Sequence, residues 1–562
     1  MKHCPECNRN YADPTLSFCL EDGASLIFGP AVEDPETAIL SGDPASESRT
    51  KLKSDARTFD PYHTRTTPYS NASRTWFFGA AAAVIMFAAA GYFAYFYFPS
   101  TTSTKPIDSV AVLPFVNKSG DQESEYLSDG LTESLVYRLS QLPDLKVSPP
   151  SSVTRYKSSD TDPVQAGKEL GVSAIVTGKI VERDGNLTVS AELIDVRQNK
   201  LLWGEQYDRK MSDLLATQRE IAREIVANLK LKVSGNERGL AKHYTENNDA
   251  YQLYLKARFH WNKRVVEGND KAIEYLNQAI EKDPTFALAY AGLADAYAVP
   301  SSQMAANEAM PKAKAAALRA LELDDTLAEA HTSLGRVLTA YDWDWAGAER
   351  EFKRAIELNP RYALAHEWYG AYLAAVGQLD ASVNERRVAL EIDPLSPIAN
   401  MELGQSLYWS RRYEQAIEPF QKSLELDPML PPTFVYLPLT YEQLGRSDEA
   451  IAGYQKMPTK QGNEWSSAKA GLGCIYAKTG RKHDALALLA ELEDAERKQY
   501  VPATSIAHLY IGLGDNDEAM AWLEKGFKQR AFHLQWLKVD PRWDALRSDP
   551  RFNVLIRRMG LS

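Results

Sequence analysis

The longest apolar stretch of the chain runs from residue 76 to residue 98 and contains no charged side chain. A helix of this length spans about 30 Å, the thickness of the hydrocarbon core of a bilayer. Trp76 near one end and Tyr95 and Tyr97 near the other suit the headgroup layers, where amphipathic rings settle. The pattern predicts a single transmembrane helix at residues 76–98, with a buried core helix as the alternative.

Basic residues are more frequent before this stretch than after it. An excess of lysine and arginine stays in the cytoplasm, so the amino terminus is expected inside the cell. We predict a bacterial inner-membrane, single-pass protein with a cytoplasmic amino terminus and periplasmic carboxy-terminal domains; inverted topology is the alternative. The basic residues concerned are Lys51, Lys53, Arg57, Arg65 and Arg74 before the stretch, against Lys105 and Lys118 after it.

Two short spacings at the amino terminus suggest a metal site. Cys4 and Cys7 form a Cys-x-x-Cys pair, and Cys19 and Asp22 repeat this spacing with an aspartate in the last place. Two such turns facing each other supply the four tetrahedral ligands that zinc prefers. The segment resembles the small zinc ribbons at the amino ends of many bacterial membrane proteins, which implies one structural zinc ion. His3 is an alternative fourth ligand, and a metal-free ribbon and a redox dithiol are the alternative interpretations.

We place the zinc ribbon at residues 1–25 and a linker at residues 26–73. The linker is rich in proline, serine, threonine and acidic residues, and it lacks sustained apolar periodicity. Such a composition cannot bury enough apolar surface to offset the entropy of ordering, so a disordered tether is expected.

Residues 106–235 predict an α/β domain of mixed topology. Short apolar runs alternate here with amphipathic stretches. Asp184-Gly185 is a hairpin signal, because glycine tolerates the positive φ that such turns need. Ser128 or Asp129 is expected to cap a helix that continues through Leu139. The other expected elements are strands at residues 107–116, 145–147, 172–180, 187–196 and 200–207, and helices at 163–170 and 211–231.

Three blocks of this domain, at residues 110–115, 126–133 and 202–208, resemble the TolB-amino-terminal-like domain of bacterial envelope and signalling proteins. The resemblance implies a non-catalytic module between a membrane helix and a repeat array. The sequence holds no glycine-rich phosphate loop, catalytic-loop aspartate or Asp-Phe-Gly motif. An enzyme within this domain is therefore the weaker hypothesis.

Residues 249–530 repeat themselves. Asp/Asn-Pro pairs begin at residues 359, 393 and 427, which are 34 residues apart. A sustained period of this length predicts an all-α helix–turn–helix solenoid, in which small residues stand where paired helices touch. The small residues that keep the step are Ala272, Ala313, Ala348, Ser382, Ala416, Ala450, Ala485 and Ala519.

The repeats resemble the tetratricopeptide repeat. Leu403-Gly404, Ala416, Phe420 and Pro428 match one unit, and about eight units cover half of the chain. The resemblance implies a concave face that is lined by the first helix of each pair and takes an extended or helical peptide. The candidate partner-binding residues by repeat position are Glu367, Met401, Gln405 and Tyr408. Residues 531–562 are expected to form a cap over the last pair.

The net charge of −11, without a long basic run, argues against nucleic acid as a partner. Taken together, these patterns predict a multidomain protein: zinc ribbon, transmembrane helix, α/β domain and tetratricopeptide solenoid. We expect a non-catalytic membrane scaffold or adaptor that binds a protein or peptide partner, with no small-molecule substrate. An envelope signalling or sensor protein that works with a separate kinase or cyclase is the alternative.

Overall fold

The computed structural model divides the chain into two units, Met1–Thr101 and Thr102–Ser562, and each is described by itself. The described residues are 2–3, 10–11, 27–28, 107–119, 124–142, 145–157, 161–229, 244–262, 266–299, 306–458 and 462–561.

The described residues of the first unit form three short strands. β1 (Lys2–His3) is central and pairs antiparallel with both β2 (Asn10–Tyr11) and β3 (Ile27–Phe28). Apart from β3, the expected linker at residues 26–73 lies outside the described residues.

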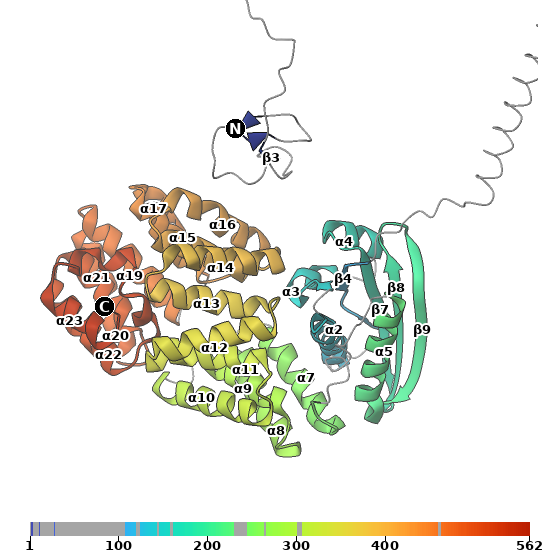
Figure 1. Ribbon diagram of the computed structural model, residues 1–562. Helices are drawn as coiled ribbons and strands as arrows, with labels where there is room; N and C mark the ends of the chain where they lie inside the picture. Colours follow the sequence, from blue (N-terminus) through green and yellow to red (C-terminus); the bar gives the residue numbers. More distant parts are fainter. Residues whose placement is uncertain are drawn as a thin grey trace, which may run out of the picture. The chain divides into compact units, whose positions relative to one another are not determined.

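The second unit begins with an α/β domain (Figure 1). Its strands follow the order β6-β4-β7-β8-β9, and β5 also pairs with β7. β4 runs parallel to β6 and β7, whereas β7, β8 and β9 are antiparallel. The bounds are β4 (Ser109–Val112), β5 (Val116–Asn117), α2 (Glu125–Ser140), β6 (Lys146–Val147), α3 (Pro150–Val153), α4 (Pro163–Glu169), β7 (Ala174–Arg183), β8 (Asn186–Asp195), β9 (Lys200–Lys210) and α5 (Leu214–Asn228).

The sheet is covered on two faces at β4. Val110 and Val112 pack into the main core with the buried residues of α2 and α5. Ala111 and Leu113 belong to a smaller cluster that includes Val153 of α3. Burial on both faces explains why this strand reads as a continuous apolar run rather than as an alternating one.

Local predictions in this domain have mixed outcomes. The hairpin is confirmed, because Asp184 and Gly185 have φ of 51° and 77° between β7 and β8. The expected cap at Ser128 or Asp129 is wrong, since α2 already begins at Glu125. The Ser128 hydroxyl donates instead to the carbonyl of Phe115.

Helices α7 to α22 form an array of eight antiparallel pairs in the described chain. All eight small residues that keep the repeat step are fully buried, which confirms that the pairs touch at these positions. A Cβ atom on Gly404 would lie 2.7 Å from the ring of Phe420, so only glycine permits that approach of α15 to α16. The bounds are α7 (Asn248–Asn262), α8 (Val266–Lys282), α9 (Ala287–Ala298), α10 (Ala306–Leu323), α11 (Ala328–Val337), α12 (Trp345–Leu358), α13 (Ala363–Ala375), α14 (Leu379–Ile392), α15 (Pro397–Trp409), α16 (Tyr413–Leu426), α17 (Thr433–Gln443), α18 (Ser447–Gln455), α19 (Asn463–Lys478), α20 (Lys482–Glu496), α21 (Ala503–Leu513) and α22 (Asn516–Lys528).

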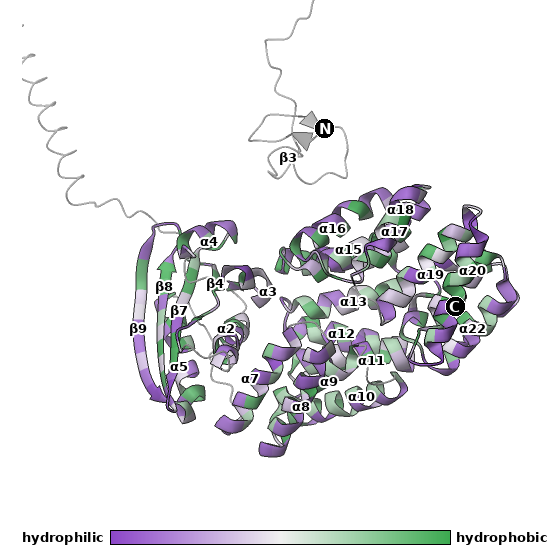
Figure 2. Ribbon diagram, turned by 180° about the vertical axis from the view of Figure 1, so that it is seen from behind, coloured by the Kyte–Doolittle hydropathy of each residue, from purple (hydrophilic) through white to green (hydrophobic). Residues whose placement is uncertain are grey.

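The expected membrane localisation needs correction. Within the described ranges, no helix is both long enough and apolar enough to cross a membrane. α10, the longest described helix with 18 residues, carries Lys312, Lys314 and Arg319. Polar and apolar residues are mixed along the helices of the array (Figure 2). This finding contradicts the single-pass inner-membrane placement with a periplasmic carboxy-terminal part, and we assign no such localisation; residues 76–98 lie outside the described residues.

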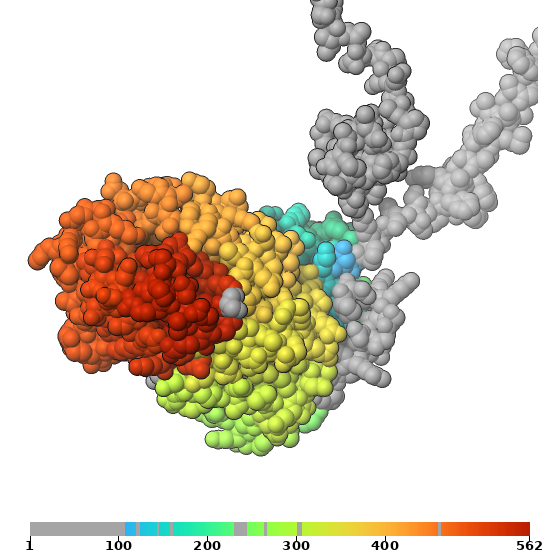
Figure 3. Space-filling view, turned by 60° about the vertical axis from the view of Figure 1, so that its left-hand side comes forward, coloured from blue at the N-terminus to red at the C-terminus, as the bar shows by residue number. Residues whose placement is uncertain are grey.

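The chain ends in two short 3₁₀ helices and one α-helix. η5 (Phe532–Trp536), η6 (Pro541–Leu546) and α23 (Pro550–Arg558) follow the last pair. The expected cap contacts α21 and α22, but it also reaches the middle of the array. In Figure 3 these red residues lie against the orange and yellow parts of the chain. The indole N–H of Trp345, the first residue of α12, donates to the carbonyl of Met559 at 2.7 Å.

Candidate functional site

The candidate partner-binding residues all lie on first helices of their pairs, as expected. Glu367 belongs to α13, and Met401, Gln405 and Tyr408 belong to α15. Each is at most 8% exposed. The face that they line is therefore covered in this structure, and their role in binding a partner stays a prediction.

Residues 531–547, here called the tail, cover part of this face. The indole of Trp536 donates to the carbonyl of Ala371 at 3.1 Å, and its ring lies 4.8 Å from that of Trp409. Further along, Arg411 forms an ion pair with Asp544 at 2.7 Å. We call the surface formed by α11, α13, α15 and α17 on this side the inner face.

One buried ion pair fixes the turn of the tail. Asp540 accepts hydrogen bonds from the backbone N–H of Arg542 at 3.0 Å and from its Nη2 at 2.6 Å. Burial lowers the pKa of the Arg542 guanidinium, but Asp540 and the nearby Tyr436 and Tyr408 together hold this pKa above its ordinary value. The guanidinium also faces the ring of Tyr436 in α17 at 6.0 Å. A charged, paired side chain thus helps to hold the tail against the inner face.

The tail makes stability depend on pH. Burial, and then Arg542, lower the pKa of His533 to about 4. In the unfolded chain this histidine takes up a proton near pH 6.5, whereas in the folded chain it does so only near pH 4. The free energy of unfolding therefore falls as the pH decreases from 6.5 toward 4. The loss is measured as the difference between the urea midpoints at pH 7 and pH 4.5. We expect this difference to be smaller in His533→Gln than in the parent protein. The loss does not vanish, because burial also lowers the pKa of His508. His483→Gln, the same change at an exposed position, is the matched control.

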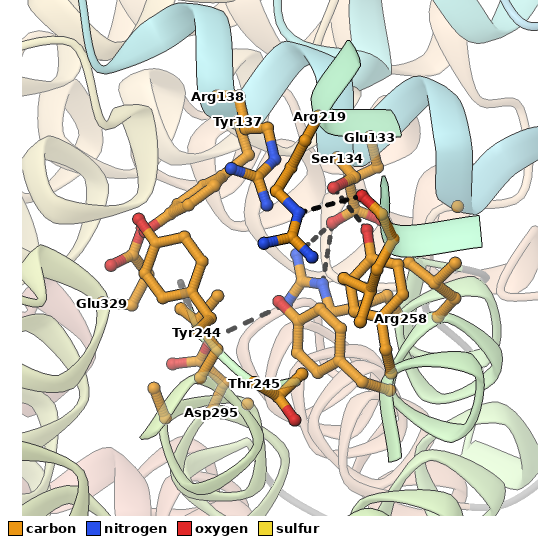
Figure 4. A pocket seen from close by; sticks show the side chains of 18 of the residues that line it. Glu133, Ser134, Tyr137, Arg138, Arg219, Tyr244, Thr245, Arg258, Asp295 and Glu329 are labelled. Atoms are coloured by element: carbon orange, nitrogen blue, oxygen red, sulfur yellow. Dashed lines mark hydrogen bonds and ion pairs between the residues drawn. The ribbon is translucent and has the colours of Figure 1, made fainter. Parts of the chain in front are cut away.

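A second candidate site is a cavity of about 80 Å³ between the α/β domain and the first repeats. Figure 4 shows charged and aromatic side chains from both parts around it. Its residues come from α2, α5, the segment just before α7 and the array: Gly130, Glu133, Ser134, Tyr137, Arg138, Leu215, Arg219, Tyr244, Thr245, Tyr251, Tyr254, Leu255, Arg258, Leu288, Ala291, Gly292, Asp295, Glu329 and Tyr362.

Hydrogen bonds across the cavity join the α/β domain to the array. Arg258 of α7 donates to Glu133 of α2 at 2.7 Å and lies 3.9 Å from Asp295 of α9. The hydroxyls of Ser134 and Tyr251 are 2.6 Å apart. Burial lowers the pKa of Arg258, yet the pKa lies above its ordinary value because Glu133 is close. The cavity is therefore built from paired groups that hold two modules together.

Two tyrosines of this cavity are hydrogen-bond donors at neutral pH. Burial raises the pKa of Tyr244 and of Tyr251 to about 12, so both phenols stay protonated at neutral pH. They are hydrogen-bond donors rather than bases. Sequence patterns gave no indication of this cavity, because residues that meet in it, such as Glu133 and Arg258, are as much as 125 positions apart.

The candidate zinc ligands lie outside the described residues. In sequence, Cys4 and Cys7 fall between β1 and β2, and Cys19 and Asp22 fall between β2 and β3. Each spacing thus falls between two consecutive strands of the small sheet. Among the described residues, no group of three or more histidine, cysteine, aspartate or glutamate side chains fits a metal. Zinc binding stays a prediction.

We expect the purified full-length chain to contain one zinc ion, measured by elemental analysis. Cysteine binds zinc as a thiolate, which serine cannot replace. Cys7→Ser should therefore remove most of the metal. Asp22→Asn and His3→Ala form a matched pair, of which only the true fourth ligand should weaken zinc affinity. Equal zinc content in the parent and Cys7→Ser proteins would contradict the site.

Two family models match the chain. Residues 106–224 match the second domain of HilA/YgeH-like transcriptional regulators, which overlaps the α/β domain. Residues 504–532 match the tetratricopeptide repeat. This match covers nearly all of α21 and all of α22, the last pair of the helical array. The expected TolB-amino-terminal-like resemblance stays a prediction.

Curated relatives match parts of the chain. The putative adenylate cyclase 3 of Rhizobium meliloti (strain 1021) is 33% identical over 200 residues, which is 35% of this chain and 33% of that protein. The transcriptional regulator HilA of Salmonella typhimurium is 26% identical over 284 residues, 49% of each chain. The chain thus spans a third to a half of the length of these relatives.

Among solved structures, Pseudomonas aeruginosa pilF is 20% identical and covers 42% of this chain and 98% of that one, with a TM-score of 0.32.

Proposed function

We propose that the protein is a non-catalytic scaffold that binds a protein partner through its tetratricopeptide array. The observation that supports this function is the tail on the inner face. The array already holds a polypeptide segment there, through a backbone carbonyl, aromatic rings and an ion pair. These are the interactions by which helical repeats hold peptides.

The experiment is site-specific photo-crosslinking in the cells that produce the protein. A crosslinking amino acid at Arg411, at the rim of the inner face, should yield a discrete adduct with another protein. The same amino acid at the exposed Leu318 of α10, a second helix, is the control and should not yield that adduct. If position 411 gives only intramolecular adducts with the tail, the scaffold function is contradicted.

A signalling protein is the second candidate function. Its support is the match to a transcriptional regulator and to a putative adenylate cyclase, each over part of the relative. In this case the α/β domain and the array would receive a signal, and a kinase or cyclase on a separate chain would give the output. Cyclase or kinase activity in the adducts from position 411 would favour this function, and adducts without either activity would favour the plain scaffold.

A further inference from the structure

Arg336 of α11 is a buried cation without an acidic partner. Its side chain stands between two aromatic rings, 4.6 Å from the centre of Phe532 in the tail and 5.4 Å from that of Trp368 in α13. The residue is 9% exposed. No hydrogen bond or ion pair links its guanidinium to any residue that the structure describes, and its Nε is a buried donor without a partner.

Such a group is costly for the folded chain. Removing a cation from water is compensated in most proteins by a carboxylate close by. Here the pKa of Arg336 is lowered to about 10 by burial alone, with no carboxylate near enough to raise it. The two rings contribute a cation–π attraction, which offsets only part of the cost of desolvation.

Other polar atoms under the tail are also unsatisfied. Trp409 is fully buried, and its Nε1 has no hydrogen-bond partner within the described ranges. The same is true of Oε1 of Gln535, in the tail itself. The tail therefore fills the inner face sterically and satisfies its polar groups incompletely, unlike a well-matched ligand.

We propose that the inner face binds a partner segment that places a carboxylate side chain against Arg336, in place of Phe532, and an aromatic ring in the position of Trp536. This inference rests on the proposed scaffold function and adds the chemistry of the partner. The required spacing is read from the tail: an aspartate or glutamate four residues before a tryptophan. The tail runs across the inner face and continues into α23, so the carboxylate belongs to an internal residue rather than to a chain terminus.

The partner displaces η5 by supplying what the tail lacks. An aromatic ring can reuse the carbonyl of Ala371 and the ring of Trp409, as Trp536 does. The carboxylate then adds a charge-assisted hydrogen bond to the unpaired guanidinium. Bonds of this kind contribute about 1.5–3 kcal/mol in proteins, which corresponds to at least tenfold in affinity.

The first experiment measures peptide binding to the full-length Trp536→Ala protein, whose tail is weakened. Two fluorescent peptides carry the sequence of residues 531–547 with glutamate or glutamine in place of Phe532. We expect the glutamate peptide to bind about tenfold more tightly than the glutamine peptide. Arg336→Met, added to the same protein, should abolish this difference. Equal affinities, no binding of either peptide, or a difference that survives Arg336→Met would overturn the proposal.

The second experiment does not depend on a tail-weakened variant. In the otherwise unchanged chain, Phe532→Glu should unfold at a higher urea concentration than Phe532→Gln, because only glutamate pairs with Arg336. With Arg336→Met the two midpoints should coincide. A glutamate variant that is no more stable than the glutamine variant overturns the proposal. Crosslinking at position 411 tests the scaffold function separately, so a partner that is captured there independently of Arg336 refutes this inference alone.

Discussion

Arg258→Met should lower the free energy of unfolding by about 3 kcal/mol, the low end of the range for breaking a buried ion pair. Arg258 is 20% exposed at its side chain, and its partner Glu133 is 17% exposed. Methionine keeps the apolar, unbranched stem of the side chain but leaves Glu133 without its cation. Because Glu133 belongs to α2 and Arg258 to α7, the loss falls on the contact between the α/β domain and the array.

The measurement is the urea midpoint of the full-length protein, followed by tryptophan fluorescence. Arg209→Met is the matched control, since Arg209 pairs with Glu220 at the surface of the same unit and should cost less than about 1 kcal/mol. Glu133→Gln with Arg258→Met should be less destabilising than the sum of the single changes, because each one breaks the same pair. Additive effects would show that the pair does not connect the two modules.

The repeat architecture could be predicted because its signal is local and recurs. Each helix pair needs a small residue where its helices cross, and the same need arises every 34 residues. Ala348, Ser382 and Ala416 are therefore visible in the sequence and fully buried in the structure. The hairpin at Asp184-Gly185 is local in the same sense, since two residues with positive φ define it.

The position of the tail could not be predicted, because its contacts join distant residues. Trp536 bonds to Ala371, 165 positions away, and no periodic feature links them. The cavity at Arg258 has the same origin, since Glu133 is 125 positions away. Arg336 looks like an ordinary polar residue of an amphipathic helix, and only the tail that covers it reveals an unpaired charge.

A local signal also failed where tertiary structure competed with it. Ser128 is a good helix cap by residue type, yet its hydroxyl donates to the carbonyl of Phe115, which lies within the apolar run expected as the first strand. That strand is itself shorter than expected, since β4 ends at Val112 and β5 begins at Val116. Pro114 between them has no N–H to donate to a sheet.

Trp409→Ala should have the largest effect on stability, a loss of about 3–5 kcal/mol. Trp409 is fully buried, and its ring contacts Trp536 of the tail at 4.8 Å and Tyr436 of α17 at 6.2 Å. Truncation to alanine leaves a cavity between α15, α17 and the tail, which cannot all move inward to fill it. Trp465→Ala, at a partly buried tryptophan that stacks on Lys469 at 4.7 Å, is the matched control and should cost much less.

Comparing Trp409→Ala with Trp536→Ala shows whether the tail is part of the core of the array. Both changes remove the same ring contact, so the double variant should lose less than the sum of the two single losses, by about 0.5–3 kcal/mol. Urea unfolding of the four proteins gives this coupling. A coupling near zero would mean that the tail rests on the inner face without stabilising it. A large coupling means that a partner must replace the Trp409 contact to bind there, which is why the proposed partner segment carries an aromatic ring as well as a carboxylate.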